Sequence, residues 1–343
     1  MRRCIQLAGM GAGQVAPNPM VGAVLVYAGR VIGEGYHQKY GKAHAEVNCI
    51  NSVAENDRQF IAAGTLYVSL EPCAHFGKTP PCADLIIESK IPEVVIGCRD
   101  CFNEVNGRGI ERLKQAGIQV TVGVLEKECL ALNKRFFTFH DRQRPYVILK
   151  WAQSIDRKIA GDSSSRILIS NESSNRLVHK WRSEEAAILV GTNTALTDDP
   201  SLTTRLWPGN DPVRLVIDQE LKLPAHLNLF DGKVETIVFN YLKKEDRGKL
   251  HYLQLNRQDD LPEQLLQALY EKQLQSLLVE GGAKLLQSFI DAGLWDEARI
   301  ICNEQLKIGK GLNAPVLKNK ILLREERIDT DVISFFVKTG NTE

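Results

Sequence analysis

Apolar residues follow two different spacings along this chain. Short runs of β-branched and aliphatic residues predict buried strands, whereas apolar residues that recur every three or four positions predict helices. The predicted strands are 21–27, 30–35, 64–70, 93–98, 118–122, 146–154, 186–190, 213–218, 235–240, 276–280, 299–302 and 333–338. The predicted helices are 1–10, 45–53, 109–116, 127–139, 171–182, 261–272 and 282–290, with a further helix beginning at Pro80. Strands that alternate with helices indicate βαβ units, a largely parallel sheet and an α/β fold.

Polar segments divide this pattern into two domains. The run 140–145, HDRQRP, predicts a linker. We therefore expect a helix–sheet–helix sandwich at 1–142 and a second α/β domain at 146–343, and a length of 343 residues agrees with two domains. Within the second domain we expect a glycine-bearing turn at 191–194 and a loop at 197–200.

Metal chemistry is indicated by His44, Cys73 and Cys82 in the first domain, with Glu46 two residues after the histidine. One imidazole and two thiolates leave the fourth position of a tetrahedral zinc site open for water, and zinc lowers the pKa of that water to about 7. An H-x-E motif followed by P-C and a further Cys is the signature of zinc deaminases. Thr79 as N-cap and Pro80 as first helical residue would place Cys82 in the first turn of a helix.

Two alternatives to a catalytic zinc site stay open at this point. The usual deaminase signature has two residues between its cysteines, whereas eight residues separate Cys73 from Cys82. These cysteines could be ordinary core residues beside a surface histidine. Glu46 could also be a fourth ligand, which would make the site a closed, structural zinc module.

Composition limits the remaining classes of function. Apolar and charged fractions of 43% and 25% are ordinary for a globular protein, and a net charge of +1 gives no basic footprint for nucleic acid. A deaminase acting on tRNA or single strands is therefore disfavoured, since it needs a basic channel with stacking aromatics. We expect no membrane span and no signal peptide. Eight cysteines without dense spacing predict reduced thiols and a cytoplasmic protein, with Cys98 and Cys101 as packing residues.

The second half contains two candidate ligand contacts. Lys150 lies within the apolar run 146–154, where it could be an edge residue that reaches water or a ligand contact at the strand's carboxyl end. Gly281 and Gly282 stand between a predicted strand and a predicted helix, which suits a dinucleotide phosphate, although a Gly-Gly pair alone is weak evidence.

These residues resemble the bifunctional deaminase/reductase family of riboflavin biosynthesis over nearly the whole chain. The motifs that carry the resemblance are APNPMVG, GEGYHQKYGKAHAEV and SLEPCAHFGKTPPC in the first half, and LKWAQSIDRKIA, TDDPSLTTR and VEGGAKLL in the second. The resemblance implies a cytidine-deaminase-like α/β/α sandwich followed by a dihydrofolate-reductase-like α/β domain. The first would use one zinc ion per chain to hydrolyse the 2-amino group of 2,5-diamino-6-ribosylamino-4(3H)-pyrimidinone 5′-phosphate. The second would reduce the ribosyl group of the deaminated product, 5-amino-6-(5-phosphoribosylamino)uracil, to ribityl with NADPH.

The same resemblance implies roles for individual residues. It makes His44, Cys73 and Cys82 the zinc ligands, Glu46 the proton shuttle and Lys150 a catalytic residue. The implied substrate contacts are Asn18, His37, His75, Lys78, Ser165, Arg182, Leu202, Arg205 and Glu280. The implied NADPH contacts are Ala152, Leu168, Thr194, Asp198 and Gly282. Arg157 stands where the family often has glycine, and Leu168 where tryptophan is common. We expect a small-molecule substrate, neither a nucleic-acid nor a membrane partner, and a homo-oligomer.

Overall fold

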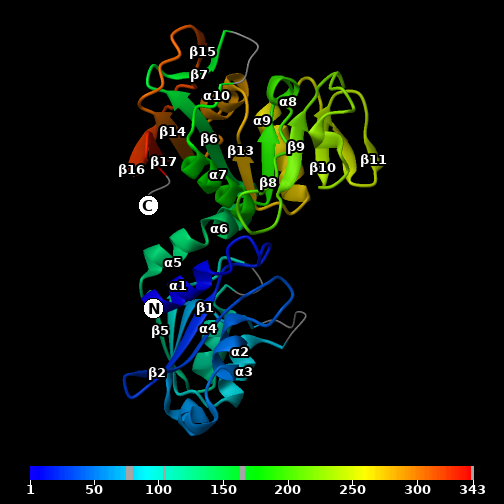
Figure 1. Cartoon of the computed structure of the whole chain (residues 1–343). Helices are drawn as coiled ribbons and strands as arrows, with labels where there is room; N and C mark the ends of the chain where they lie inside the picture. The colour runs from blue at the N-terminus through cyan, green and yellow to red at the C-terminus, as the bar shows by residue number, and fades with distance from the viewer. Residues whose placement is uncertain (75–79, 103–105, 163–166, 341–343) are drawn as a thin grey trace. The chain divides into compact units, whose positions relative to one another are not determined.

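The chain folds into two compact units, Met1–Gln143 and Arg144–Glu343 (Figure 1). A computed structural model describes residues 1–74, 80–102, 106–162 and 167–340. Both units are built from a β-sheet with helices packed on it, which confirms the predicted α/β class. In the described part of the chain, no helix combines the length and apolar character needed to cross a bilayer.

The first unit contains a five-stranded mixed sheet. In spatial order the strands are β2 (Arg30–Tyr36), β1 (Gly22–Tyr27), β3 (Thr65–Leu70), β4 (Glu93–Cys98) and β5 (Gln119–Val122). Strands β3, β4 and β5 run parallel, whereas β1 pairs antiparallel with both β2 and β3. The parallel βαβ arrangement predicted for 64–122 is therefore confirmed, and the hairpin β1–β2 adds the antiparallel part.

Helices cover both faces of this sheet. On one face, α2 (Ala45–Asn51), α3 (Cys82–Glu88) and α4 (Arg108–Gln115) bury their apolar sides in one cluster with β1, β3 and β4. On the other face lie α1 (Arg2–Gly9) and α5 (Glu126–Leu132). The 3-10 helix η1 (Glu55–Ala63) precedes β3, and α6 (Lys134–Arg142) ends the unit. This arrangement confirms the predicted helix–sheet–helix sandwich.

The second unit contains a ten-stranded sheet. Its spatial order is β11 (Glu245–Arg247), β12 (Leu250–Gln254), β10 (Thr236–Asn240), β9 (Val213–Ile217), β8 (Ala187–Val190), β13 (Ser276–Val279), β6 (Tyr146–Ser154), β14 (Glu297–Asn303), β17 (Asp331–Lys338) and β16 (Lys320–Ile328). The strands from β12 to β14 run parallel. At one edge β11 is antiparallel to β12, and at the other β17 and β16 are antiparallel to their neighbours. A separate ribbon pairs β7 (Lys158–Gly161) with β15 (Gly311–Asn313).

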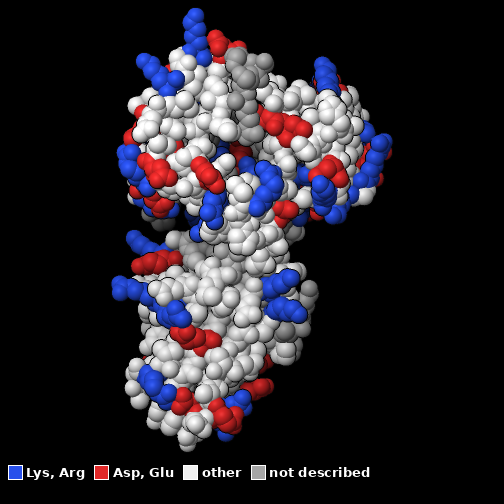
Figure 2. Space-filling model, viewed as in Figure 1, with Lys and Arg blue, Asp and Glu red and all other residues white. Residues whose placement is uncertain are grey.

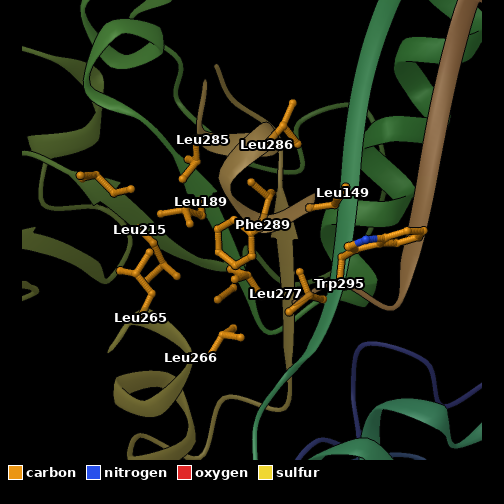
Figure 3. Packing of buried hydrophobic residues seen from close by; sticks show 14 of the residues in the cluster. Leu149, Leu189, Leu215, Leu265, Leu266, Leu277, Leu285, Leu286, Phe289 and Trp295 are labelled. Atoms are coloured by element: carbon orange, nitrogen blue, oxygen red, sulfur yellow. The ribbon is translucent and has the colours of Figure 1, made fainter. Parts of the chain in front are cut away.

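The central strands of this sheet are buried on both faces, so their side chains divide between two apolar clusters by the two-residue period of a strand. Val147 and Leu149 of β6 face α9 (Leu261–Glu271) and α10 (Ala283–Asp291), where Phe289 fills the middle of the cluster (Figure 3). Ile148 points to the opposite cluster. The remaining helical segments are α7 (Glu172–Glu184), α8 (Thr192–Asp198) and η2 (Asn228–Phe230). Because of this alternation, polar side chains at the ends of β6 and β13 lie on the same face of the sheet when their positions match in register.

One predicted helix is two helices in the structure. The prediction of a single helix at 127–139 is wrong, because α5 ends at Leu132 and α6 begins at Lys134. Between them, Asn133 accepts a hydrogen bond from Met20 N and donates one to Met20 O, both at 2.8 Å. These two hydrogen bonds hold the Asn133 side chain against the loop at Met20, and the helix is interrupted at this residue. Because α6 continues to Arg142, the predicted linker at 140–145 is helical over its first half.

Three other local predictions are wrong. Helix α3 begins at Cys82 with Pro81 as its N-cap rather than at Pro80, and Thr79 lies outside the described residues. Helix α8 occupies the predicted turn at 191–194 and part of the loop at 197–200, with Gly191 as its N-cap. Strand β16 is missing from the prediction because most of it is exposed, so it lacks the alternation of a strand with one buried face.

Candidate active sites

Three separate elements bring the predicted zinc ligands together in the first unit. His44 is the N-cap of α2, Cys73 follows β3, and Cys82 is the first residue of α3. Cys73 and Cys82, with eight residues between them in the sequence, therefore lie close together in space. These three side chains are the only candidate metal group of three or more His, Cys, Asp and Glu residues within the described part of the chain.

The donor atoms fit a tetrahedral zinc ion. His44 Nδ1 lies 3.7 Å from Cys73 Sγ and 3.4 Å from Cys82 Sγ. Ordinary Zn–N and Zn–S bonds at tetrahedral angles separate nitrogen and sulfur ligands by about 3.6 Å. All three ligand atoms lie within 4.8 Å of one another. The geometry therefore favours a metal site over two unrelated core cysteines and a surface histidine.

The pKa values of the two thiols, Cys73 and Cys82, are shifted in opposite directions. Hydrogen bonding by the Cys82 side chain, together with His44, lowers the pKa of Cys73, whereas the neighbouring Cys73 and burial raise the pKa of Cys82. The Cys82 amide also donates to Cys73 Sγ at 3.3 Å. The pair thus readily holds one thiolate, and a divalent cation would favour the second.

Glu46 lies in the first turn of α2, two residues after His44. It is 3% exposed, and burial, with the Cys73 charge as a further cause, raises the pKa of its carboxyl to about 7. The group of ligand atoms in the described residues consists of His44, Cys73 and Cys82 and does not include Glu46. A buried carboxyl that lies close to the ligand group without belonging to it is suited to moving protons.

Two predicted substrate contacts meet beside the ligands. Asn18 Nδ2 and His37 Nε2 are 3.2 Å apart, and the His37 ring makes an edge contact with His44 at 5.4 Å between centroids. His37 Nδ1 lies 3.1 Å from the Ala43 carbonyl, and burial lowers the pKa of this histidine. A neutral imidazole that donates to Ala43 leaves its Nε2 facing the Asn18 amide. His75 and Lys78 lie outside the described residues.

A second charged group lies in the second unit, on the sheet face opposite the cluster shown in Figure 3. Lys150 and Glu280 follow Ile148 and Leu278, which pair across β6 and β13 and share that face. Lys150 Nζ lies 3.7 Å from Glu280 Oε2. Strand β6 lies between β13 and β14, so the interpretation of Lys150 as an edge residue is wrong.

Arg182 of α7 completes this group. Its Nε and Nη2 donate to the two oxygens of Glu280 at 2.8 and 2.7 Å. Burial alone would raise the pKa of Glu280, but the charges of Arg182 and Lys150 lower it to about 2. Glu280 is therefore an anion at neutral pH, held between two cations in a largely dry environment.

The 202–205 loop lies against the same arginine. The Thr203 carbonyl accepts from Arg182 Nη1 at 3.3 Å, and Arg205 Nη1 donates to Thr203 Oγ1 at 3.1 Å. Leu202 is buried with a φ of +51°, so its side chain is core, which leaves its backbone as the part that can contact a ligand. Ser165 lies outside the described residues.

The residues predicted to hold NADPH include a glycine cradle. Gly281 and Gly282 lie against Thr194 of α8: a Cβ on Gly281 would come within 3.1 Å of Thr194 Cγ2, and one on Gly282 within 3.5 Å of Thr194 Oγ1. Gly282 also has a φ of +73°, which side chains rarely adopt. Gly281 is packed under Val190 and Thr194, whereas the half-buried Gly282 is the N-cap of α10, a position that suits a dinucleotide phosphate.

The other predicted cofactor residues are less closely grouped. Asp198 ends α8, one turn after Thr194, and Ala152 lies on β6 beyond Lys150. Leu168 is 75% exposed, and its place in a cofactor site stays a prediction. Arg157 adopts a φ of +57° in the turn between β6 and β7, which accounts for glycine at this position in the family pattern.

Comparisons with known proteins identify both halves of the chain. The family model of the cytidine and deoxycytidylate deaminase zinc-binding region matches residues 1–98, and that of the RibD C-terminal domain matches residues 145–306. The riboflavin biosynthesis protein RibD of Aquifex aeolicus is 38% identical, over 98% of this chain and 97% of the relative. The chain belongs to the RibD family.

Other RibD proteins extend this result. RibD of Escherichia coli is 34% identical over 87% of this chain and 84% of its own length. A Thermotoga maritima structure, described as a diaminohydroxyphosphoribosylaminopyrimidine deaminase/5-amino-6-(5-phosphoribosylamino)uracil reductase, matches with a TM-score of 0.91 and 37% identity over 98% of this chain and 97% of that one. Acinetobacter baumannii RibD matches with a TM-score of 0.87 and 31% identity over the same shares.

Membership of the RibD family assigns the general activity. The protein is a bifunctional enzyme of riboflavin biosynthesis, with a hydrolytic deaminase in the first half and a reductase in the second. Its cofactors are Zn²⁺, which the His/Cys/Cys group fits, and NADPH for the RibD reductase domain. Acidic and basic side chains are intermixed over the face of each unit seen in Figure 2.

Sequence reasoning missed two buried polar residues that lie next to the candidate sites. His179 is 3% exposed, lies three residues before Arg182 on α7, and is influenced by the charges of Arg182 and Arg205. The i, i+3 spacing from Arg182 could have indicated it. Glu71 is buried beside the zinc ligands, where its carboxylate accepts backbone hydrogen bonds. A strand-end carboxylate gives no comparable signal in the sequence.

Proposed function

We propose that this RibD protein deaminates 2,5-diamino-6-ribosylamino-4(3H)-pyrimidinone 5′-phosphate and then reduces 5-amino-6-(5-phosphoribosylamino)uracil to the ribitylamino product. The observation that carries the proposal is the convergence of His44, Cys73 and Cys82 with the buried Glu46 beside them. The description of the Thermotoga maritima relative supports the choice of substrates.

In the deaminase, His44, Cys73 and Cys82 hold the metal, which when bound supplies a Lewis acid that activates water at neutral pH. Glu46 removes a proton from the attacking water and returns protons to the ring nitrogen and the departing amine. Its carboxyl is buried in the first turn of α2, two residues after the ligand His44, within reach of a water held at the open metal position. The C–N bond breaks, and ammonia leaves as oxygen takes its place.

Substrate contacts in the deaminase come from Asn18 and His37, whose amide and imidazole lie 3.2 Å apart. The Asn18 amide and the His37 imidazole can both form hydrogen bonds with a polar substrate ring, and the contact between them fixes their orientation. His75 and Lys78, in the segment between the two cysteines, would add contacts to a phosphorylated substrate, and these two roles rest on the family resemblance alone.

In the reductase, Lys150 donates the proton that opens the ribosyl ring, while NADPH supplies the hydride. The Lys150 Nζ atom lies 3.7 Å from Glu280 Oε2, so the proposed proton donor stands beside a buried carboxylate on this sheet face. Arg182 and Arg205 bind anionic or hydroxyl groups of the substrate beside Glu280, and the backbone at Leu202 and the side chain of Ser165 complete the substrate contacts.

We further propose that NADPH lies against Gly282 and Thr194, with Ala152, Leu168 and Asp198 as additional contacts. Gly282 supports this placement, because it is half-buried and Thr194 Oγ1, at 3.5 Å, is the one described atom near its Cβ position. All eight cysteines are free thiols, which agrees with a reducing, cytoplasmic location. A homo-oligomer stays a prediction.

A two-stage assay tests the proposal. Incubated with the diaminopyrimidine ribotide alone, the purified full chain should exchange one amino group for oxygen and stop. Adding NADPH should then oxidise the cofactor and add two hydrogen atoms to the accumulated product, which mass spectrometry resolves. NADPH oxidation that needs no deaminated product, or deamination that needs NADPH, would contradict the two-site proposal.

A further inference from the structure

Glu71 is a buried carboxylate, two residues before Cys73, that accepts four backbone hydrogen bonds. Its Oε1 accepts from the amides of Gly109 and Ile110 at 3.0 and 3.3 Å. Its Oε2 accepts from the amides of Gly107 and Asp100 at 3.0 and 3.3 Å. The side chain is 4% exposed, so these bonds are made in a largely water-free environment.

The four amides belong to the start of α4 and to the loop before it. The first amides of a helix have no partner within the helix, and a carboxylate placed there satisfies them and interacts favourably with the helix dipole. Gly107, the N-cap of α4, has no side chain that could do this, so Glu71 caps the helix from a distant segment. A Cβ on Gly109 would lie 1.9 Å from the Pro72 carbonyl oxygen, so α4 also touches the ligand segment directly.

This cap is directly continuous with a proposed metal ligand. Glu71 lies two residues before Cys73, with a rigid proline between them. The Glu71 amide donates to the Cys98 carbonyl at 3.0 Å, and the Cys73 carbonyl accepts from Ala83 N at 3.1 Å. The backbone is thus tied to β4 before the ligand and to α3 after it, while the Glu71 carboxylate ties the same three residues to α4.

We propose that Glu71 is a positioning residue of the deaminase, which holds Cys73 in place for zinc by capping α4. The inference rests on the proposed role of Cys73 as a zinc ligand. Glu71→Gln keeps the size of the side chain but replaces one acceptor oxygen with an NH₂ group, which would face amide N–H groups as donor against donor. The ligand segment and α4 should therefore separate, and Cys73 should lose its fixed position.

The test compares Glu71→Gln with the matched control Glu93→Gln in the full chain. Glu93 begins β4 at the far end of the β3–β4 pair, where its carboxylate accepts from Thr65 Oγ1 at 2.7 Å. We expect Glu71→Gln to lower zinc affinity about 10–100-fold, measured by competition with a chelator. The cobalt-substituted protein should show shifted d–d bands, since these report the arrangement of the thiolate ligands. Reductase activity should be unchanged.

Two further variants keep the test decisive. Glu71→Asp retains the charge but withdraws the carboxylate by one methylene, so zinc affinity should fall less than in Glu71→Gln. Cys73→Ser tests the ligand assignment itself: a protein that keeps its zinc after this change would overturn the proposed site, whatever Glu71 does. If Cys73→Ser loses zinc while both Glu71 variants keep wild-type affinity and cobalt spectra, Glu71 only stabilises the fold and the inference is wrong.

Discussion

Arg182 and Glu280 form a two-point ion pair, with Nε–Oε1 and Nη2–Oε2 distances of 2.8 and 2.7 Å. Their side chains are 13% and 7% exposed, so little water competes for either charge. Glu280, the carboxylate of this pair, also faces Lys150 Nζ. The ion pair therefore links the stability of the second unit to the arrangement of its reductase site.

Removing the arginine should destabilise the second unit. Arg182→Leu leaves Glu280 buried with Lys150 as its remaining cation at 3.7 Å, and an uncompensated buried charge costs about 3–5 kcal/mol. Denaturant unfolding followed by tryptophan fluorescence measures this unit alone, because all four tryptophans (Trp151, Trp181, Trp207 and Trp295) belong to it. Arg247→Leu is the control, since Arg247 pairs with Glu245 at an exposed edge and its loss should leave the midpoint unchanged. Equal midpoints for both variants would show that the buried pair contributes nothing.

The second unit should lose stability between pH 6.5 and pH 4. Burial, with the charges of Arg182 and Arg205, lowers the pKa of His179 from 6.5 to about 4. In that window the unfolded chain binds a proton on this imidazole and the folded protein does not, so the free energy of unfolding falls as pH falls. His179→Gln should reduce this pH dependence of the tryptophan-detected transition, whereas His226→Gln, at an exposed position, should keep it. An unchanged pH dependence in His179→Gln would exclude His179 as the source.

A side chain at Gly282 should weaken NADPH binding. Gly282 has a φ of +73°, and an added Cβ would enter the surface facing Thr194 Oγ1 at 3.5 Å. We expect Gly282→Ala to raise the KM for NADPH at least about tenfold, the equivalent of 1.4 kcal/mol, without affecting deamination. Gly232→Ala is matched for backbone strain, because Gly232 has a φ of +70° with open space around its Cβ position. A similar KM in the two variants would remove the glycine cradle from the cofactor site.

Zinc content should depend on the two proposed thiolate ligands. Cys73→Ser and Cys82→Ser should each lose most of the single zinc expected per chain and all deamination, as measured by metal analysis and ammonia release. Cys302→Ser, a free cysteine of the second unit, should keep both. Chelation of the wild type should stop deamination and leave the reduction of supplied deaminated intermediate intact. Loss of reductase activity on chelation would mean that the two halves do not work independently.

Local patterns predicted those parts of the molecule that depend on short-range chemistry. Cys82 lies in the first helical turn, as the helix start predicted at Thr79 and Pro80 indicated, and the strands that carry Lys150 and lead into Glu280 were predicted from their apolar runs. The break at Asn133 was not predictable in this way, because it depends on hydrogen bonds to Met20, more than a hundred residues away. His179 was missed because its burial beside Arg182 and Arg205 depends on tertiary packing.

The central claim is that Glu46 moves protons in a zinc deaminase while a separate site performs the reduction. Its most direct test is Glu46→Gln in the full chain, since glutamine keeps the size and a hydrogen-bonding carbonyl but cannot relay a proton. We predict that this variant retains zinc, binds the pyrimidine and reduces the deaminated intermediate at the wild-type rate, while deamination falls by at least about 10²–10⁴-fold. Deamination at a near-normal rate would contradict the mechanism, and loss of zinc would make Glu46 a ligand rather than the proton carrier.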